Sequence, residues 1–479
     1  MIKVLFAAAE CEPFIKTGGL ADVIGSLPNK LKNYGIDARV IIPKYSDIAD
    51  HFKEEMKHIA NFNVQIGWRN QYCGIEQMEY RGVTYYFVDN EYYFKRKGLY
   101  GFYDDGERFA YFSRAILEAL PKIPFKPDII HCNDWHTAPV SILIKEQYQY
   151  NPFYENIRSF FTIHNLKYQG VFPKEVLGDL LGLEDECFTS EKLEYYGNVN
   201  YLKGGLVYSD IISTVSETYA EEIQNSYFGE NLDGILRKRR NDLYGIINGI
   251  DYDIFNPNYD PYISANYCKT TGKSPQNKSK LQEILNLPQR EDVPIICIIS
   301  RLVPEKGLDL ITCVFEEILN LDIQFVVLGT GSEKLENFFA TKAAHHSNKL
   351  STNVFFDNAL AHKIYAGSDF ILMPSLYEPC GLSQLIALSY GTIPIVRETG
   401  GLNDTIHSFN EYTNTGNGLS FTNINAHDML NTIQRGVSLF HNKDKWNRLV
   451  SNAMNCDYSW HSSAQKYINL YKYLMEKAI

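Results

Sequence analysis

A chain of 479 residues is too long for one ordinary domain, so its length predicts two or three. Apolar residues make up 45% of the chain and charged residues 22%, a balance that is typical of a globular protein with ample core and excludes a disordered chain. The formal net charge of −11, from 46 basic and 57 acidic residues, disfavours binding to nucleic acid or to anionic membranes.

Nine cysteines are scattered along the chain without a C-x-x-C pair, which favours a reducing compartment. The first ten residues read as a strand and not as a signal peptide. No stretch approaches the roughly 20 apolar residues of a membrane span. We therefore expect a cytoplasmic protein that binds neither nucleic acid nor membrane.

The first half of the chain alternates apolar or β-branched runs with helical patterns, which predicts a parallel sheet with helices on both faces. The predicted strands are Val4–Ala8, Ala38–Ile42, Val83–Val88, Asp128–His131, Ser159–Ile163 and Asp210–Val215. Amphipathic patterns at Arg108–Leu120 and Ala138–Gln147 predict helices between them. The stretch Phe62–Arg81 is expected to form an antiparallel excursion.

The second half repeats this pattern, so two doubly wound α/β domains are predicted. Its strands are Ile295–Ile299, Gln324–Leu328, Val354–Phe356, Phe370–Met373, Ile393–Val396 and Gly418–Phe421. Its helices are Leu308–Leu319, Leu382–Ser389, Met429–Leu439 and Trp446–Met454. The boundary is expected near Gly245–Pro257, where Asn-Gly and Asn-Pro pairs favour turns.

Polar side chains follow many of the predicted strands at their carboxyl ends, where ligands of such sheets bind. They include Glu10, Lys16, Asp134, His136, His164, Asn165, Arg301, Lys306 and Glu378. These residues should line one rim in each domain. Two rims that face each other across a central cleft would form a small-molecule site.

One motif occurs twice, as Thr17-Gly18-Gly19-Leu20-Ala21-Asp22 and as Thr399-Gly400-Gly401-Leu402-Asn403-Asp404. A Gly-Gly pair between a strand and a helix lets backbone N–H groups approach an anion at the positive end of the helix. Lys16 adds a full charge to the first copy. We interpret the pair as two lips of one anion-binding cleft, with two ordinary strand-to-helix turns as the alternative.

Arg301 and Lys306 follow one strand at a spacing that suits a loop entering a helix, and together they fit a diphosphate. An ion pair with a neighbour such as Glu305 is the alternative. Glu378 can accept hydrogen bonds from sugar hydroxyls, and Gly381 is expected to begin a helix whose N–H groups face a phosphate. Cys380 could be only a packing residue.

Other interpretations carry less weight. A metal held by His131, Asp134 and His136 is disfavoured because the spacing matches no standard site. Asp134 could instead cap a helix, and His164 could be a core histidine. A dinucleotide oxidoreductase would need G-x-G-x-x-G after the first strand, which the sequence lacks.

Six ordered motifs carry a resemblance to a known family. They are Lys16-Thr17-Gly18-Gly19-Leu20-Ala21-Asp22-Val23, Asn133-Asp134-Trp135-His136, Thr162-Ile163-His164-Asn165, Asn248-Gly249-Ile250-Asp251, Ser300-Arg301-Leu302 with Lys306-Gly307, and Glu378-Pro379-Cys380-Gly381-Leu382. In these the chain resembles the bacterial glycogen synthases, ADP-glucose-dependent glucosyltransferases related to plant starch synthases. The resemblance spans essentially the whole chain.

The resemblance implies the GT-B architecture of two Rossmann-like domains, with the final helix packed on the N-terminal one. The implied domains are residues 1–246 completed by 462–479, and residues 247–461. It also implies transfer of glucose from ADP-glucose to an α-1,4-glucan with retention at the anomeric carbon, with neither metal nor cofactor. The oligomeric state stays open.

The same resemblance assigns roles to matching residues. Lys16, Gly18 and Gly19 would contact ADP-glucose, Arg301 and Lys306 the diphosphate, and Glu378 with the N–H groups of Cys380, Gly381 and Leu382 the glucose. Asp22, Asp134, His164 and Asn165 would serve the acceptor and the glucose, and His164 would stabilise the positive sugar. Phe356 would stack on adenine. Phe94 stands where relatives have a tyrosine that contacts glucose.

Three hypotheses follow. The first is a glycogen synthase. The second is another GT-B transferase that uses a different nucleotide sugar, such as UDP-glucose, or a different acceptor. The third is an inactive protein that binds glycans or nucleotide sugars. The intact Lys16, Arg301, Lys306 and Glu378 favour the first.

Overall fold

The structure of the protein, a computed structural model, describes residues 1–476. Backbone contacts divide the chain into two compact units. The first unit comprises Met1–Asn248 and the segment from Trp460 onward, and the second comprises Gly249–Ser459. Residues 477–479 of the helical segment predicted over 462–479 lie outside the described part.

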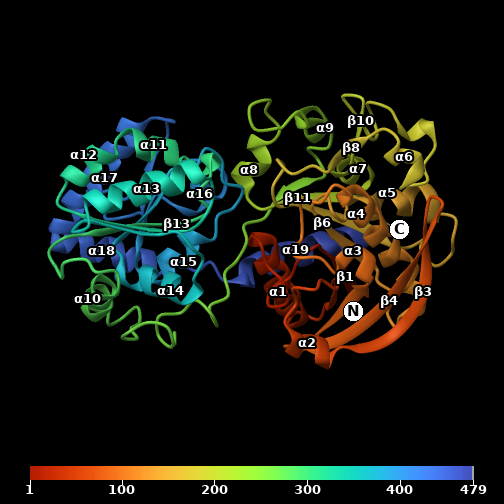
Figure 1. The fold of residues 1–479 in the computed structure, drawn as a ribbon, viewed down its shortest axis with the longest axis horizontal. Coiled ribbons are helices and arrows are strands. Elements are labelled where there is room, and N and C mark those ends of the chain that lie inside the picture. Colours follow the sequence, from red (N-terminus) through yellow and green to blue (C-terminus); the bar gives the residue numbers. More distant parts are fainter. Residues whose placement is uncertain (477–479) are drawn as a thin grey trace. The chain divides into compact units, whose positions relative to one another are not determined.

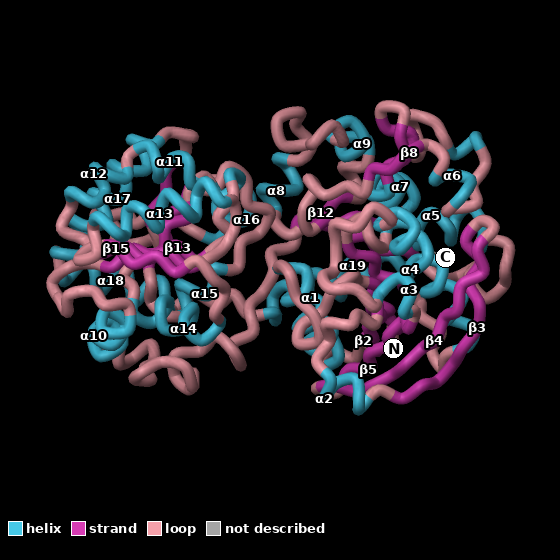
Figure 2. Tube along the Cα trace, in the orientation of Figure 1, coloured by secondary structure: helices cyan, strands magenta, loops and turns pink. Residues whose placement is uncertain are grey.

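The first unit is built on a sheet of strand order β12-β11-β7-β6-β1-β2-β5-β4-β3. Its strands are β1 (Lys3–Ala7), β2 (Asp37–Pro43), β3 (Lys57–Ile66), β4 (Arg69–Tyr80), β5 (Val83–Asp89), β6 (Ile129–Asn133), β7 (Arg158–Ile163), β11 (Ile211–Thr214) and β12 (Leu243–Gly245). Strands β3 and β4 pair antiparallel at the outer edge, as the long hairpin in Figure 2 shows, and β4 pairs antiparallel with β5. The remaining pairs are parallel. A small sheet joins β8 (Val171–Pro173), β10 (Asn198–Asn200) and β9 (Glu194–Tyr195).

Helices cover both faces of this sheet because its parallel strands are apolar on both sides. The helices of this unit are α1 (Gly19–Lys32), α2 (Asp50–Glu55), α3 (Glu91–Phe94), α4 (Asp105–Ala119), α5 (Ala138–Leu143), α6 (Val176–Asp179), α7 (Tyr201–Tyr208), α8 (Glu217–Glu222), α9 (Asp233–Lys238) and α19 (Trp460–Glu476). Helix α4 packs against α5, and α5 against α7, while α1 packs against α19. The C-terminal helix is anchored by Tyr471, whose hydroxyl lies 2.7 Å from His131 Nδ1 in the core.

The second unit has a parallel sheet of order β15-β14-β13-β16-β17-β18. Its strands are β13 (Ile295–Ile299), β14 (Gln324–Leu328), β15 (Leu350–Asn353), β16 (Phe370–Met373), β17 (Ile393–Arg397) and β18 (Leu419–Phe421). Its helices are α10 (Pro275–Ile284), α11 (Leu308–Cys313), α12 (Phe315–Asn320), α13 (Glu333–His345), α14 (Asn358–Gly367), α15 (Ser383–Ser389), α16 (Gly400–Thr405), α17 (Ala426–His441) and α18 (Lys443–Met454). Figure 1 shows α11, α12, α13 and α17 on one face and α10, α14, α15 and α18 on the other.

One predicted strand is wrong. Val354–Phe356 is not a strand, because β15 ends at Asn353 and the chain turns outward into α14. The start of α14 is fixed by Asp357, whose side chain accepts a hydrogen bond from the Leu360 N–H at 2.8 Å. Phe355 and Phe356 are therefore exposed ahead of this helix.

Candidate active site

In both units the strand order reverses beside the first strand of the sheet. In the first unit β1 lies between β2 and β6, and in the second β13 lies between β14 and β16. Loops diverge at such a reversal and leave a crevice at the carboxyl ends of the strands, which is where doubly wound sheets bind ligands. The loops after β1 and β6 carry Lys16 and Asp134, and the loops after β13 and β16 carry Arg301 and Glu378.

The loop after β1 presents Lys16, Thr17, Gly18 and Gly19 at the surface. Helix α1 begins at Gly19, and its N-cap residue is Gly18, which has no side chain to bond the first N–H groups of the helix. Glu10 shapes the loop, since its carboxylate accepts hydrogen bonds from the Thr17 N–H at 2.5 Å and from the Thr17 hydroxyl at 2.8 Å. Burial raises the pKa of Glu10 to about 6, although these bonds oppose the shift.

Lys16 is paired with Asp22, and their side chains meet at 2.6 Å (Nζ to Oδ1). Burial raises the pKa of Asp22, and the charge of Lys16 opposes this shift. The ammonium is thus held by a side chain of the first turn of α1. This arrangement gives an anion a cation and a helix N-terminus together.

Asp134 follows β6 in the left-handed region, at φ 56°. Its carboxylate accepts a hydrogen bond from the His164 N–H at 2.7 Å, so it ties the loop after β6 to the loop after β7. Burial raises the pKa of Asp134 to about 7, and the backbone bonds from His164 and Asn165 oppose the shift. The helix-cap alternative is wrong, because α5 begins at Ala138 and Thr137 is its N-cap.

His164 lies beside Asn133, with 2.9 Å between His164 Nε2 and Asn133 Oδ1. The Asn133 amide nitrogen donates to the carbonyls of Ala7 and His131, so its oxygen is the acceptor and His164 Nε2 carries the proton. Burial lowers the pKa of His164 to about 3. The ring is therefore neutral at pH 7, with Nδ1 as an acceptor. Asn165 turns its own loop, since its side chain accepts from the Lys167 N–H at 3.1 Å.

The histidines of the disfavoured metal hypothesis pack against other side chains. His131 Nε2 lies 2.6 Å from the Thr162 hydroxyl, and Nδ1 faces Tyr471. The ring of His136 packs 4.6 Å from that of Tyr100 and 4.1 Å from that of Trp135. No group of three or more His, Cys, Asp or Glu within residues 1–476 is arranged to hold a metal ion.

Tyr100 is a site residue that the sequence did not reveal. Its hydroxyl is buried, and burial is the main reason why the pKa of this phenol is raised. The negative charges of Glu10 and Asp134 raise it further. Phe94, which stands where a tyrosine was expected, is a fully buried core residue that packs on Tyr45 and Tyr111.

In the second unit Lys306 and Glu378 form an ion pair, with 2.6 Å between Nζ and Oε2. The Ser375 hydroxyl donates to the same carboxylate oxygen at 3.0 Å. Glu378 is buried, whereas Lys306 is partly exposed and Arg301 is exposed. The pair joins the loop after β13 to the loop after β16 and places a cation and a hydrogen-bond acceptor side by side.

Glycines let the loops of the second unit interlock. A Cβ on Gly307 (φ 69°) would lie 1.9 Å from the Pro374 carbonyl oxygen, and one on Gly329 would lie 1.8 Å from that of Ser300. The Leu376 N–H also donates to the Glu305 carbonyl at 2.9 Å. The loops after β13, β14 and β16 thus form one rigid support under Arg301, Lys306 and Glu378.

The second copy of the repeated motif belongs to this support. Gly400 and Gly401 are buried, and the Gly401 N–H donates to the Glu378 carbonyl at 3.0 Å. A Cβ on Gly401 would lie 2.0 Å from the Cys380 carbonyl oxygen. The two copies therefore differ in their surroundings, because the glycines of the second copy seat the Glu378 segment and those of the first are exposed. The interpretation of the pair as two lips of one anion-binding cleft stays a prediction.

The segment after Glu378 differs from the prediction in one respect. Gly381 does not begin the helix: it is left-handed at φ 75°, and α15 begins at Ser383 with Leu382 as its N-cap. Cys380 is buried beside it. Phe356 is 81% exposed and so is accessible to a flat ligand.

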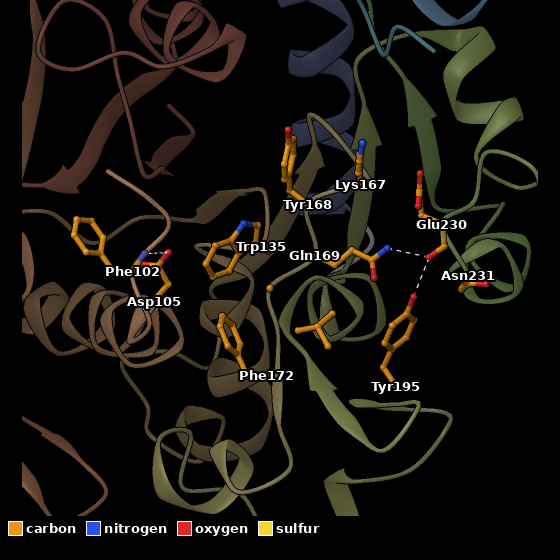
Figure 3. A pocket seen from close by; sticks show the side chains of 12 residues that line it. Phe102, Asp105, Trp135, Lys167, Tyr168, Gln169, Phe172, Tyr195, Glu230 and Asn231 are labelled. Carbon is orange, nitrogen blue, oxygen red and sulfur yellow. Dashed lines mark hydrogen bonds between the residues drawn. The ribbon is translucent and has the colours of Figure 1, made fainter. Parts of the chain in front are cut away.

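A pocket of about 500 Å³ opens in the first unit, and its lining includes Trp135, the residue that follows Asp134 in the chain. One wall is aromatic, formed by Trp135 and Phe172 with ring centroids 5.7 Å apart. The opposite wall is polar, formed by Gln169 and the turn Glu230–Asn231 (Figure 3). Apolar faces with a few fixed polar groups are typical of small-molecule sites, and flat sugar rings suit aromatic walls.

The sequence did not predict this pocket. Its residues come from five separate segments of the chain that meet only in the fold. The signal that could have pointed to it is local: Trp135 follows Asp134 directly, and Gln169 and Gly170 follow His164 and Asn165 within a few residues.

Comparisons with known proteins match both units. Residues 3–238 match the family model of the starch synthase catalytic domain, and residues 280–455 match that of the group 1 glycosyl transferases. The chain is 58% identical to a glycogen synthase of Desulforamulus reducens over 475 residues, which covers 99% of both proteins. It is 56% identical to a glycogen synthase of Geobacillus stearothermophilus over 477 residues, covering 99% of this chain and 98% of that one.

Solved structures of glycosyltransferases have the same fold as this chain. The catalytic domain of starch synthase IV from Arabidopsis thaliana, bound to ADP and acarbose, superposes with a TM-score of 0.92 at 34% identity and covers 99% of both chains. A sucrose-phosphate synthase of Thermosynechococcus elongatus matches at a TM-score of 0.62 and 15% identity over the full length of both chains, which shows a shared fold alone. Within residues 1–476, no helix is long and apolar enough to cross a membrane.

Proposed function

Because the chain belongs to the glycogen synthase family of glycosyltransferases and has its two-domain GT-B fold, we propose that it transfers glucose from ADP-glucose to the non-reducing 4-hydroxyl of an α-1,4-glucan, with retention. One observation carries the choice of a sugar diphosphate as donor. At the strand-order reversal of the second unit, Lys306 and Glu378 pair at 2.6 Å, so a cation for phosphate lies next to an acceptor for sugar hydroxyls.

In this proposal, basic side chains of the protein neutralise the charge of the diphosphate. Arg301, Lys306 and Lys16 stabilise the negative charge that grows on the phosphate oxygens as the bond to the sugar breaks. Fixed donors of this kind act without a metal ion. Glu378 and the N–H groups of Cys380, Gly381 and Leu382 orient the glucose, and Phe356 stacks on the adenine.

The sugar becomes positively charged at its anomeric carbon as ADP departs. His164 is neutral, so its carbonyl oxygen or its Nδ1 lone pair can face that charge without repulsion. Asp134 places a carboxylate nearby. The C1–O bond to the β-phosphate breaks, the bond from C1 to the acceptor O4 forms on the same face, and the hydroxyl proton passes to a departing phosphate oxygen.

We place the acceptor glucan in the pocket of the first unit. Its aromatic wall, which includes Trp135 directly after Asp134 in the chain, suits the rings of a glucan chain. Asp22 in the first turn of α1 and Asn165 in the loop after β7 lie at the carboxyl ends of the strands and would bind acceptor or glucose hydroxyls.

We propose a cytoplasmic location. None of the nine cysteines, all of which lie within the described residues, forms a disulfide. This is what a reducing cytoplasm favours.

Initial rates of nucleotide release test the donor and the acceptor together. Glycogen should stimulate release of ADP from ADP-glucose far more than release of UDP from UDP-glucose, and digestion of the product should show α-1,4 links. Preference for UDP-glucose would favour the alternative GT-B transferase, and absence of turnover with any donor would leave only a binding function.

A further inference from the structure

Gln169 belongs to the polar wall of the pocket, and the next residue, Gly170, lies against Trp135 of the aromatic wall. Gln169 is 8% exposed, and both the nitrogen and the oxygen of its amide form hydrogen bonds. Its nitrogen donates to the Glu230 carbonyl at 2.9 Å, and its oxygen accepts from the Asn200 amide at 2.6 Å. Because Asn200 also caps α7, by accepting from the Lys203 N–H at 2.9 Å, the side chain of Gln169 is fixed to a rigid element.

The polar wall depends on that amide. Glu230 and Asn231 are both left-handed, at φ 47° and 62°, a conformation that residues other than glycine adopt only when their surroundings hold them there. The restraints converge on one atom, the Glu230 carbonyl oxygen, which accepts from Gln169 and from the Tyr195 hydroxyl at 3.1 Å. Figure 3 shows both bonds. Strained turns of this kind are concentrated at ligand sites.

The aromatic wall depends on the next residue. Gly170 is left-handed at φ 62°, and a Cβ there would lie 2.3 Å from Trp135 Cε3 and 2.7 Å from Cδ2. The indole cannot retreat freely, because the ring of Phe109 lies 5.1 Å away and that of His136 lies 4.1 Å away. Only glycine at position 170 lets Trp135 lie directly on this loop.

We propose that Gln169–Gly170 is the specificity-determining element of the acceptor pocket, since it sets the position of the Trp135 face relative to the Glu230–Asn231 turn. The inference rests on the proposed function, because it takes the glucan as the occupant. A glucosyl ring needs an apolar face on one side and hydrogen-bonding groups at its edge. Both residues act as positioning residues, through Trp135 and through the Glu230 carbonyl.

Gly170→Ala tests the aromatic wall, and Gly35→Ala is its matched control. Gly35 is also left-handed, at φ 79°, but a Cβ there meets no atom within 4 Å. Both variants therefore carry the same backbone cost, and only Gly170→Ala meets a ring. Gln169→Met tests the polar wall with a side chain of similar size that forms neither hydrogen bond.

KM and kcat would be measured with maltoheptaose as acceptor, together with KM for ADP-glucose and the slow hydrolysis of ADP-glucose without acceptor. We expect each variant to raise the maltoheptaose KM about tenfold, the size of one lost aromatic contact for Gly170→Ala and of a lost hydrogen bond for Gln169→Met. The ADP-glucose KM and the hydrolysis rate should stay within twofold of wild type. Gly35→Ala should match wild type throughout.

Two results would overturn the inference: a maltoheptaose KM within twofold of wild type in both variants, or equal increases in the KM for donor and acceptor. Gln169→Met keeps the test decisive should Gly170→Ala fail to fold. Failure of the proposed function would look different, because the wild-type protein itself would then show no glucan-dependent release of ADP.

Discussion

Replacing Lys306 by alanine removes a proposed diphosphate cation and also the partner of a buried carboxylate. Lys306 Nζ lies 2.6 Å from Glu378 Oε2. Without this ammonium, the carboxylate keeps the hydrogen bond from the Ser375 hydroxyl at 3.0 Å. Loss of one fixed donor to a developing oxyanion typically lowers kcat by about 10²–10³. Leaving a buried acceptor with fewer donors should also cost about 1–3 kcal/mol of the free energy of unfolding.

The two effects need separate assays. Initial rates of ADP release from ADP-glucose with saturating glycogen give kcat, and urea unfolding followed by circular dichroism gives stability. Lys280→Ala is the control, because Lys280 and Glu283 form an exposed pair at 2.9 Å in the same unit. Removing that pair should change stability by less than about 0.5 kcal/mol and leave kcat unaltered. A kcat for Lys306→Ala within threefold of wild type would refute the proposed role of this cation.

Three further predictions concern other residues of the site. Arg301→Ala should lower kcat about 10²–10³-fold with an unchanged unfolding curve, and near-normal turnover would remove Arg301 from the site. Asp134→Asn should abolish activity yet raise stability by about 2–4 kcal/mol above pH 7, because the fold raises the pKa of this carboxyl to about 7 and so disfavours its ionised form. That gain should shrink as the pH falls toward 4, and urea unfolding at pH 5 and pH 8 would show it; an equal gain at both would contradict the argument. Trp135→Ala should raise the KM for maltoheptaose about tenfold and leave that for ADP-glucose unchanged, as measured by initial rates; a change in the donor KM alone would place the acceptor elsewhere.

The sequence predicted most of the sheet because buried parallel strands are continuous apolar runs. Ile295–Ile299 and Phe370–Met373 are strands with the predicted limits. Val354–Phe356 is equally apolar and is not a strand, since a helix cap at Asp357 decides where the chain turns. Short apolar runs cannot reveal such a competition between neighbouring elements.

Candidate site residues could be proposed because strand ends are readable and ligands bind there. The sequence could not predict which residues surround each of these side chains in the fold. The two copies of Thr-Gly-Gly-Leu look alike, yet one is exposed beside Lys16 and the other is buried under the Glu378 carbonyl. The pocket walls and the position of Tyr100 depend likewise on contacts between loops far apart in the chain.

A crystal structure with ADP and a maltooligosaccharide would test the central claim most directly. We predict that diphosphate oxygens lie within hydrogen-bonding distance of Arg301, Lys306 and Lys16, with the oligosaccharide against Trp135. Diphosphate density remote from these cations, or an oligosaccharide bound away from that indole, would contradict the account.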